Sequence, residues 1–258
     1  MSNPFKIVSS ILNQPDMDTT SFQSVVDNYT PTAGCHQFIV EKFVEHMRAV
    51  PQYINHREWI LANRYGFGEH AFHWMWKLIV DSMPQSFKFL EIGVYCGQVT
   101  SLVQMLATEQ DKNVEICGVT PMEGGGPENH LAHNYSECIK RTYDAHGITM
   151  DNTTFVVGYS TDAKIISQFD DKQNYYDIVF IDGSHVYEDV VSDMKTFDGT
   201  LKIGGLMITD DSSNQLPMPA GYFAGIAVVS KAVEDTIAIW PYYKHLFACM
   251  HDRVWRKI

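Results

Sequence analysis

Residues 177–211 read DIVFIDGSHVYEDVVSDMKTFDGTLKIGGLMITDD, and this stretch decides the fold. It contains two apolar runs, 177–181 and 206–209, separated by an amphipathic segment and by the turn 202–205. Short apolar runs on either side of an amphipathic segment predict a strand–helix–strand unit with parallel strands. Because such crossovers are right-handed, both strands should end at the same edge of the sheet, where open α/β folds bind their ligands.

Carboxylates follow both predicted strands. Asp182 comes directly after the first, and Asp210 and Asp211 come after the second. Neighbouring strands lie about 4.8 Å apart, so these three side chains should crowd into one small volume. Such crowding is unfavourable unless a proton, a cation or a basic substrate group relieves it. The plainer alternative is that the acids only cap the strand ends or remain solvated.

The same alternation continues over the last two thirds of the chain. Further strands are predicted at 87–92, 114–119, 154–157, 244–251 and 253–257, the last two around a turn at His251 and Asp252. Helices are predicted at 99–107, 134–146, 161–168 and 224–236. Strands that alternate with helices in this way are typical of the α/β class. We therefore expect a doubly wound, mostly parallel Rossmann-like sheet with a C-terminal antiparallel strand.

The front of the chain has a different character. Prolines interrupt residues 1–33, which we expect to form an irregular arm with one or two short helices, and helices are predicted at 36–50, 57–64 and 69–82. No linker rich in Gly, Ser or Pro separates these helices from the strands. We therefore predict that 1–83 is an arm and helical cap without independent stability, and that 84–258 is the α/β domain. The aromatic residues of the cap fit core packing or a homo-oligomer surface better than a pocket wall.

Composition narrows the class of protein. The 258 residues are 45% hydrophobic and 19% charged, and the net charge of −12 argues against nucleic acid as a partner. The five cysteines are odd in number and lack the spacing of a zinc site or a disulfide framework. The N-terminus lacks the pattern of a secretory signal, and no run reaches the roughly 20 apolar residues that cross a bilayer. A cytoplasmic protein without membrane contact is expected.

The predicted strand 87–92 runs into a glycine turn. Its sequence is Glu91-Ile92-Gly93-Val94-Tyr95-Cys96-Gly97, and a helix follows. Gly93 and Gly97 permit a tight turn and close approach of a ligand to the helix N-terminus. A dinucleotide site would instead have G-x-G-x-x-G, and Glu91 would repel a pyrophosphate while suiting a cationic ligand. A nucleotide-dependent dehydrogenase is therefore disfavoured, whereas a tight turn with a solvated Glu91 stays open.

These motifs resemble a known family. The segment FLEIGVYCGQVTSL (89–102) is similar to the first motif of class I S-adenosylmethionine-dependent methyltransferases. With IDGSH (181–185) and GGLMITDD (204–211), it resembles the metal-dependent O-methyltransferases, the group that includes macrolide sugar O-methyltransferases and cephalosporin-hydroxylase-like proteins. The resemblance covers 84–258, which would then be the S-adenosylmethionine-binding methyltransferase domain.

The resemblance implies an enzyme that methylates a hydroxyl of a small molecule, of sugar or phenol type. Glu91, Gly93 and Gly97 would line the methionine part of S-adenosylmethionine, and Thr100 or Ser101 would bind its carboxylate. The remaining cofactor-binding residues implied are Tyr95, Thr120, Ser160 and Asp182, of which Ser160 would border the adenine.

The resemblance also implies a metal and a base. Asp182, Asp210 and Asp211 match the metal-binding acids of these enzymes, and ligation by carboxylates alone favours Mg²⁺ first, then Mn²⁺ or Ca²⁺. His185 matches a histidine that acts as general base, so His185 and Asp182 are the predicted catalytic residues. The alternative for His185 is a helix N-terminal residue without a catalytic part.

One position departs from the family pattern. Thr120 stands where the family usually has an acid that binds both ribose hydroxyls. A threonine can make one such hydrogen bond but not two, so a non-methylating, hydroxylase-like member and a cofactor-binding scaffold module remain alternatives. The glycine-rich segment 121–135 is expected to be either a flap over the site or a surface loop.

Overall fold

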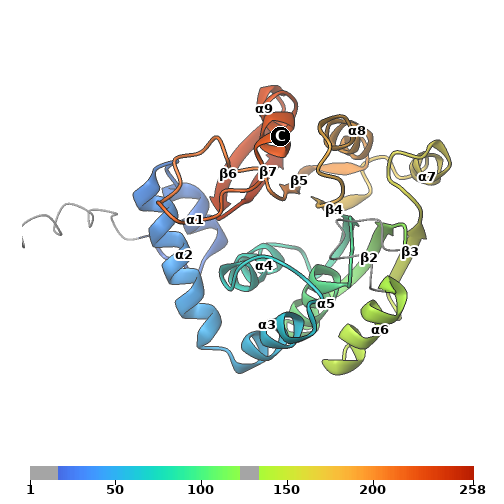
Figure 1. Ribbon diagram of the computed structural model, residues 1–258, viewed down its shortest axis with the longest axis horizontal. Helices are drawn as coiled ribbons and strands as arrows, with labels where there is room; N and C mark the ends of the chain where they lie inside the picture. Colours follow the sequence, from blue (N-terminus) through green and yellow to red (C-terminus); the bar gives the residue numbers. More distant parts are fainter. Residues whose placement is uncertain (1–16, 123–133) are drawn as a thin grey trace, which may run out of the picture.

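A single mixed sheet forms the centre of the protein, in a computed structural model that describes residues 17–122 and 134–258 (Figure 1). Its strands lie in the order β3-β2-β1-β4-β5-β7-β6. They are β1 (Ser86–Ile92), β2 (Asn113–Thr120), β3 (Thr153–Val157), β4 (Tyr176–Ile181), β5 (Leu201–Thr209), β6 (Tyr243–Cys249) and β7 (Asp252–Lys257). The first five are parallel, and β7 runs antiparallel to both β5 and β6. The predicted α/β fold is therefore confirmed.

Helices cover both faces of the sheet (Figure 1). One face carries α1 (Phe22–Asn28), α2 (Ala33–Arg48), α4 (Ala71–Asp81) and α5 (Gln98–Glu109), and α3 (Pro51–Asn63) extends this layer. The other face carries α7 (Ala163–Ile166), α8 (Tyr187–Asp198) and α9 (Ala227–Glu234), with the short helices η2 (Ser167–Phe169) and η3 (Ile237–Ile239), while α6 (Tyr135–Ala145) packs beside α5. Side chains alternate along each strand, so Phe89 and Phe180 enter the first core while Leu90 and Val179 enter the second.

Helix α4 joins the helical cap to the sheet. Nine of its eleven residues are buried, and the other two, Lys77 and Asp81, form an ion pair on its remaining face. The Trp76 ring packs edge-on against Phe89 at 5.7 Å and Phe180 at 5.2 Å between ring centroids. Residues of the cap and of the sheet therefore share one core. The division at residue 83 remains a prediction.

Two sequence expectations need correction. Residues 202–205, expected as a turn before the second strand, belong to β5, which begins at Leu201. The pairing of β5 with β4 is irregular in this region, and Gly204 has φ +84°. The strand therefore continues through Gly204 and Gly205 instead of beginning after them. The C-terminal hairpin turns at Met250 and His251, and Asp252 already belongs to β7. Residues 123–133 of the expected flap and 1–16 of the expected arm lie outside the described residues.

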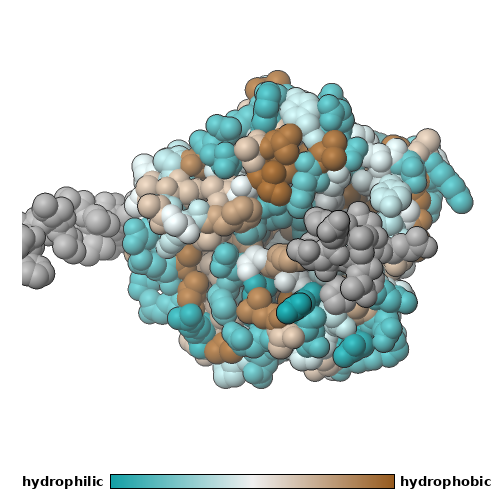
Figure 2. All heavy atoms as spheres, in the orientation of Figure 1, coloured by the Kyte–Doolittle hydropathy of each residue, from teal (hydrophilic) through white to brown (hydrophobic). Residues whose placement is uncertain are grey.

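Most buried hydrophobic side chains belong to the two large cores on either side of the sheet. On the face seen in Figure 2, the exposed hydrophobic residues form separate patches among hydrophilic ones. All five cysteines are buried as free thiols. Within the described ranges, every helix is too short or too polar to span a bilayer.

The turn after β1 depends on a residue without a side chain. Gly93 has φ +98°, and a Cβ atom there would lie 1.9 Å from the backbone oxygen of Asp182. The chain continues the β1–β4 pairing at this point, because the Asp182 N–H donates to the Ile92 carbonyl at 2.8 Å. Only glycine permits this contact, which fixes where Asp182 leaves β4.

Replacing Gly93 by alanine should therefore destabilise the protein. The added methyl group cannot avoid the Asp182 backbone, and such overpacking costs about 1–3 kcal/mol beyond the left-handed conformation itself. Urea unfolding of G93A should show a lower free energy of unfolding than wild type.

Gly147 offers a matched control, because its φ is +61° and a Cβ atom there would meet no described atom within 4 Å. G147A should lose only the roughly 1 kcal/mol expected for alanine in a left-handed conformation. Equal losses in the two variants would contradict the role of close packing at Gly93.

Candidate active site

Three carboxylates lie in one row across neighbouring strands. The register pairs Ile181 with Thr209 and Thr209 with Arg253, so one residue further along Asp182 lies beside Asp210, and Asp210 beside Asp252. The Asp210 N–H donates to the Ile181 carbonyl at 3.0 Å, which extends the β4–β5 pairing. By the alternation of side chains, all three acids point to the face that α4 covers.

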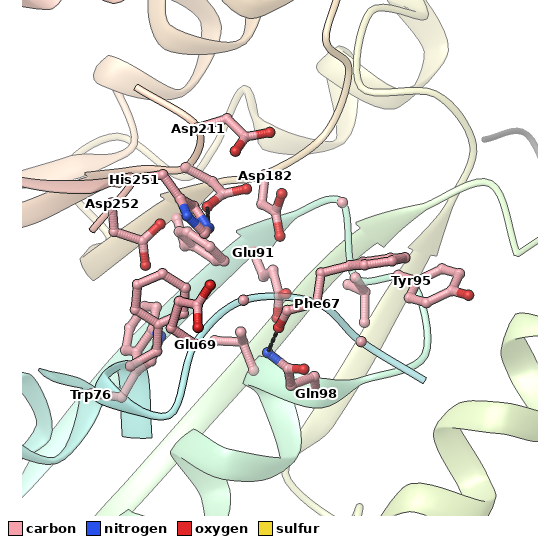
Figure 3. A pocket seen from close by; sticks show the side chains of 18 of the residues that line it. Phe67, Glu69, Trp76, Glu91, Tyr95, Gln98, Asp182, Asp211, His251 and Asp252 are labelled. Carbon is pink, nitrogen blue, oxygen red and sulfur yellow. Dashed lines mark hydrogen bonds and ion pairs between the residues drawn. The ribbon is translucent and has the colours of Figure 1, made fainter. Parts of the chain in front are cut away.

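The row borders a cavity of about 410 Å³. This volume lies within the range of small-molecule sites. Figure 3 shows Glu91, Asp182, Asp252 and His251 around one space at the carboxyl ends of the strands. Of the residues predicted from sequence, the cavity is lined by Glu91, Gly93, Tyr95, Asp182, His185, Asp210 and Asp211.

Asp210 is the charged member of the row. Burial raises the pKa of Asp182 and of Asp252, and the neighbouring Asp210 carboxylate raises both further. Burial also opposes ionisation of Asp210, but His251 and the carboxyl groups of Asp252 and Asp182 outweigh it and lower its pKa. The three acids therefore share protons, and negative charge stays on Asp210 unless a cation replaces the protons.

The side chain of Asp211 points away from the row and toward His185. Its backbone is left-handed at φ +50°, and its Oδ2 lies 3.4 Å from Nε2 of His185. Burial and the charge of Asp210 raise the pKa of Asp211 to about 6. The His185 ring is about half exposed at the cavity, where the Asp211 carboxylate can orient it.

The glycine turn connects the acids to the start of α5. Glu91 is buried, burial raises its pKa well above the usual range, and it accepts a hydrogen bond from the Thr100 backbone N–H. Gly97 has φ +80° and precedes the first residue of α5, whose N-terminus has no side-chain cap. A neutral Glu91 can sit beside the bound carboxylate and amino groups of a ligand without strong repulsion.

Five predicted cofactor residues lie outside the cavity wall, namely Gly97, Thr100, Ser101, Thr120 and Ser160. The Ser101 hydroxyl faces the cap, where it bonds His56 Nε2 at 2.9 Å, because position 101 is on the α3 side of α5. Thr120 ends β2 with a buried hydroxyl that has no hydrogen-bond partner among the described residues. Ser160 is half-buried beyond β3, beside Asp193. The binding roles of all five remain predictions.

Aromatic side chains form a further part of the cavity wall. Phe72 and Trp76 come from α4, Phe223 from the segment before α9, and Phe67 from the loop between α3 and α4. Buried Arg57 holds that loop by donating to the Phe67 carbonyl at 2.8 Å and to the Gly68 carbonyl. The cavity therefore has an acidic side and an aromatic side.

Sequence reasoning missed His251 and Asp252. It places them in a hairpin turn without reference to the site, because nothing in their spacing links them to residues 182–211. The sequence feature that could have identified them is an imidazole next to a carboxylate at a predicted strand boundary. The aromatic residues Phe72 and Trp76, for which the sequence favours packing, serve both the core and the cavity.

Asp193 on α8 is a further buried acid, and burial raises its pKa to about 7, although the Ser160 side chain partly lowers it. Its folded pKa lies above the unfolded value near 3.8, so its contribution to stability is present below pH 4 and is lost as the pH rises to 7. D193N should therefore match wild type at pH 4 and exceed it at pH 8.

Urea unfolding at several pH values measures this difference, which we expect to reach about 1–3 kcal/mol. If the free energy of unfolding changes with pH in the same way in wild type and in D193N, Asp193 does not have the raised pKa that we expect.

The chain is similar to several known proteins. Residues 90–212 match the family model of a methyltransferase domain. An uncharacterized protein of Acanthamoeba polyphaga mimivirus is 30% identical over 155 residues, which cover 60% of this chain and 65% of that protein. The matching region thus spans less than two thirds of this relative's length.

Two solved structures share the fold. A proposed caffeoyl-CoA O-methyltransferase from Staphylococcus aureus superposes with a TM-score of 0.57 at 15% identity, covering 86% of this chain and 99% of that one. An SAH-bound methyltransferase from Podospora anserina gives a TM-score of 0.52 at 14% identity, covering 85% and 88%. The family match over residues 90–212, the strand order and the glycine turn together support a methyltransferase domain of the class I, S-adenosylmethionine-dependent type.

Proposed function

We propose that the protein transfers a methyl group from S-adenosylmethionine to a hydroxyl oxygen of a small molecule, of sugar or phenol type, with assistance from a divalent cation. The observation that carries this proposal is a cavity that joins the Gly93 turn, the acidic row and the aromatic wall. A methyl donor and a ring-shaped acceptor would lie next to each other in it.

The donor fits the side of the cavity formed by the glycine turn. S-adenosylmethionine supplies an electrophilic methyl group when it is bound. Gly93 and the start of α5 would receive its methionine part, with Glu91 and Tyr95 as neighbours. The Thr120 hydroxyl at the end of β2, unpartnered among the described residues, is available to bind one ribose hydroxyl. Holding both reactants in line is the main contribution of such an enzyme.

The acceptor fits the aromatic side. Phe72, Trp76 and Phe223 would contact the flat or apolar face of a sugar or phenol ring and exclude water from the reacting oxygen. His185, oriented by Asp211, would remove the hydroxyl proton. A divalent cation beside Asp210 would lower the pKa of that hydroxyl. Buried acids that share protons fit such an ion, since it would replace those protons.

Isothermal titration calorimetry with S-adenosylmethionine tests the function directly. We expect one site per chain, and a labelled methyl group should pass to some members of a panel of phenols and sugars. D210N should keep cofactor affinity within about two-fold and lose at least about 100-fold in transfer rate, because the ion would act on the acceptor. Failure of the wild-type chain to bind S-adenosylmethionine would overturn the proposal and favour a non-methylating or scaffold role.

Thr120 gives a second prediction. T120V removes a hydroxyl without changing the shape of the side chain, and it should weaken S-adenosylmethionine binding by about 2- to 10-fold, the usual effect of one hydrogen bond. It should not lower the free energy of unfolding, because the hydroxyl has no partner in the described structure.

Thr142 is the matched control for stability. Its buried hydroxyl donates to the carbonyls of Cys96 at 3.0 Å and Cys138 at 2.9 Å. T142V should therefore lower the free energy of unfolding by about 1 kcal/mol. If T120V binds S-adenosylmethionine as tightly as wild type, the Thr120 hydroxyl does not contact the cofactor.

A further inference from the structure

The β6–β7 turn delivers two side chains into the acidic row. His251 is the last residue of the turn, after Met250 at φ +52°, and Asp252 is the first residue of β7. Both residues line the cavity and are buried, at 5% and 2% exposed. The described structure therefore adds a nitrogen donor to a site for which the sequence predicts oxygen donors alone.

The donor atoms of these residues converge with Asp210. One donor atom from each of Asp210, His251 and Asp252 lies within 4.8 Å of the other two. With metal–ligand bonds of about 2.1 Å, two ligands of one ion lie roughly 3 to 4.2 Å apart, so small side-chain shifts would allow all three to bind one ion. Among the described residues, Asp182 and Asp211 do not belong to this group.

The His251 ring is held in place on both sides. Its centroid lies 4.7 Å from that of Phe72 and 5.0 Å from that of Phe223, and both contacts are edge-to-face. Its Nε2 lies 3.4 Å from Oδ1 of Asp210. A ring fixed in this way loses little conformational entropy on binding an ion.

Two buried polar atoms in this group lack partners. Asp252 Oδ1 and His251 Nδ1 have no hydrogen-bond partner within residues 17–122 and 134–258. An unsatisfied buried polar atom costs about 1–3 kcal/mol, so such atoms at a cavity indicate a ligand. A cation bound by Asp252 would satisfy its oxygen and would also offset the repulsion along the row.

We propose that Asp210, His251 and Asp252 form a divalent-metal site whose imidazole ligand selects a first-row transition ion over Mg²⁺. Imidazole suits transition ions, whereas Mg²⁺ prefers oxygen ligands and retains several waters. Affinity should rise from Mn²⁺ to Co²⁺, following the general order for such sites. Three protein ligands leave positions open for an acceptor oxygen. The inference rests on the proposed function only where it gives this ion a role in methyl transfer.

Metal binding to the full chain, freed of metal by a chelator, tests the site without any activity measurement. Calorimetry and the visible absorption of Co²⁺ should show one site that binds Co²⁺ at least about ten-fold more tightly than Mg²⁺. H251F keeps the aromatic packing and should weaken Co²⁺ binding at least about ten-fold. H185F is the matched control and should stay within about two-fold, because His185 lies against Asp211, outside the group.

An electron-spin-echo measurement on wild type with Mn²⁺ covers the case in which H251F fails to fold. Modulation from a ¹⁴N nucleus should be present in wild type and in H185F. Its absence from wild type, or Co²⁺ binding that depends on Asp182 and Asp211 but not on His251, would overturn the inference.

Calorimetry with S-adenosylmethionine on the same samples separates the two proposals. Cofactor binding together with metal binding that ignores His251 would leave the methyltransferase proposal intact and refute the metal site. Metal binding that requires His251, in a chain that does not bind the cofactor, would support the metal site and refute the methyltransferase proposal.

Discussion

The contact between Gly93 and the backbone of Asp182 is the constraint on which the site depends. Just after β1 and β4 end, the backbone of Asp182 occupies the place that a Cβ atom of residue 93 would need. The two segments can therefore lie this close only because residue 93 is glycine. The contact fixes Asp182, and the strand register then fixes Asp210 and Asp252 in the same row. The cavity, the acids and the start of α5 thus take their positions from one steric condition in the first strand–helix turn.

The acidic row illustrates how a fold can carry an unfavourable arrangement. Asp182, Asp210 and Asp252 are close enough to share protons, and this state is costly in a buried setting. Backbone pairing across three strands holds them there regardless of the cost. Strained or repulsive groups of this kind are typical of functional sites, where a ligand relieves the repulsion. In the metal site that we propose, a cation would relieve this repulsion, and His251 would select the class of cation.

The helical cap contributes to both stability and the site. Trp76 packs on Phe89 and Phe180 of the sheet, while the same residue borders the cavity. Arg57 of α3 holds the loop that carries Phe67. A composition pattern cannot distinguish these tasks, because an apolar helix looks the same whether its far end reaches a core or a ligand. This is why the sequence favours core packing or a homo-oligomer surface over a pocket wall for the aromatic residues of the cap.

The sequence by itself determined the α/β class, the strand–helix order after residue 84 and the placement of Glu91, Gly93, Asp182 and Asp210 at one sheet edge. These follow from local periodicity and from the rule that parallel strands end together. Only the tertiary structure decided that Asp252 and His251 join Asp210, and that Asp211 turns toward His185. The reason is that antiparallel register between β5 and β7 pairs residues more than forty positions apart, and no local pattern encodes such a pairing.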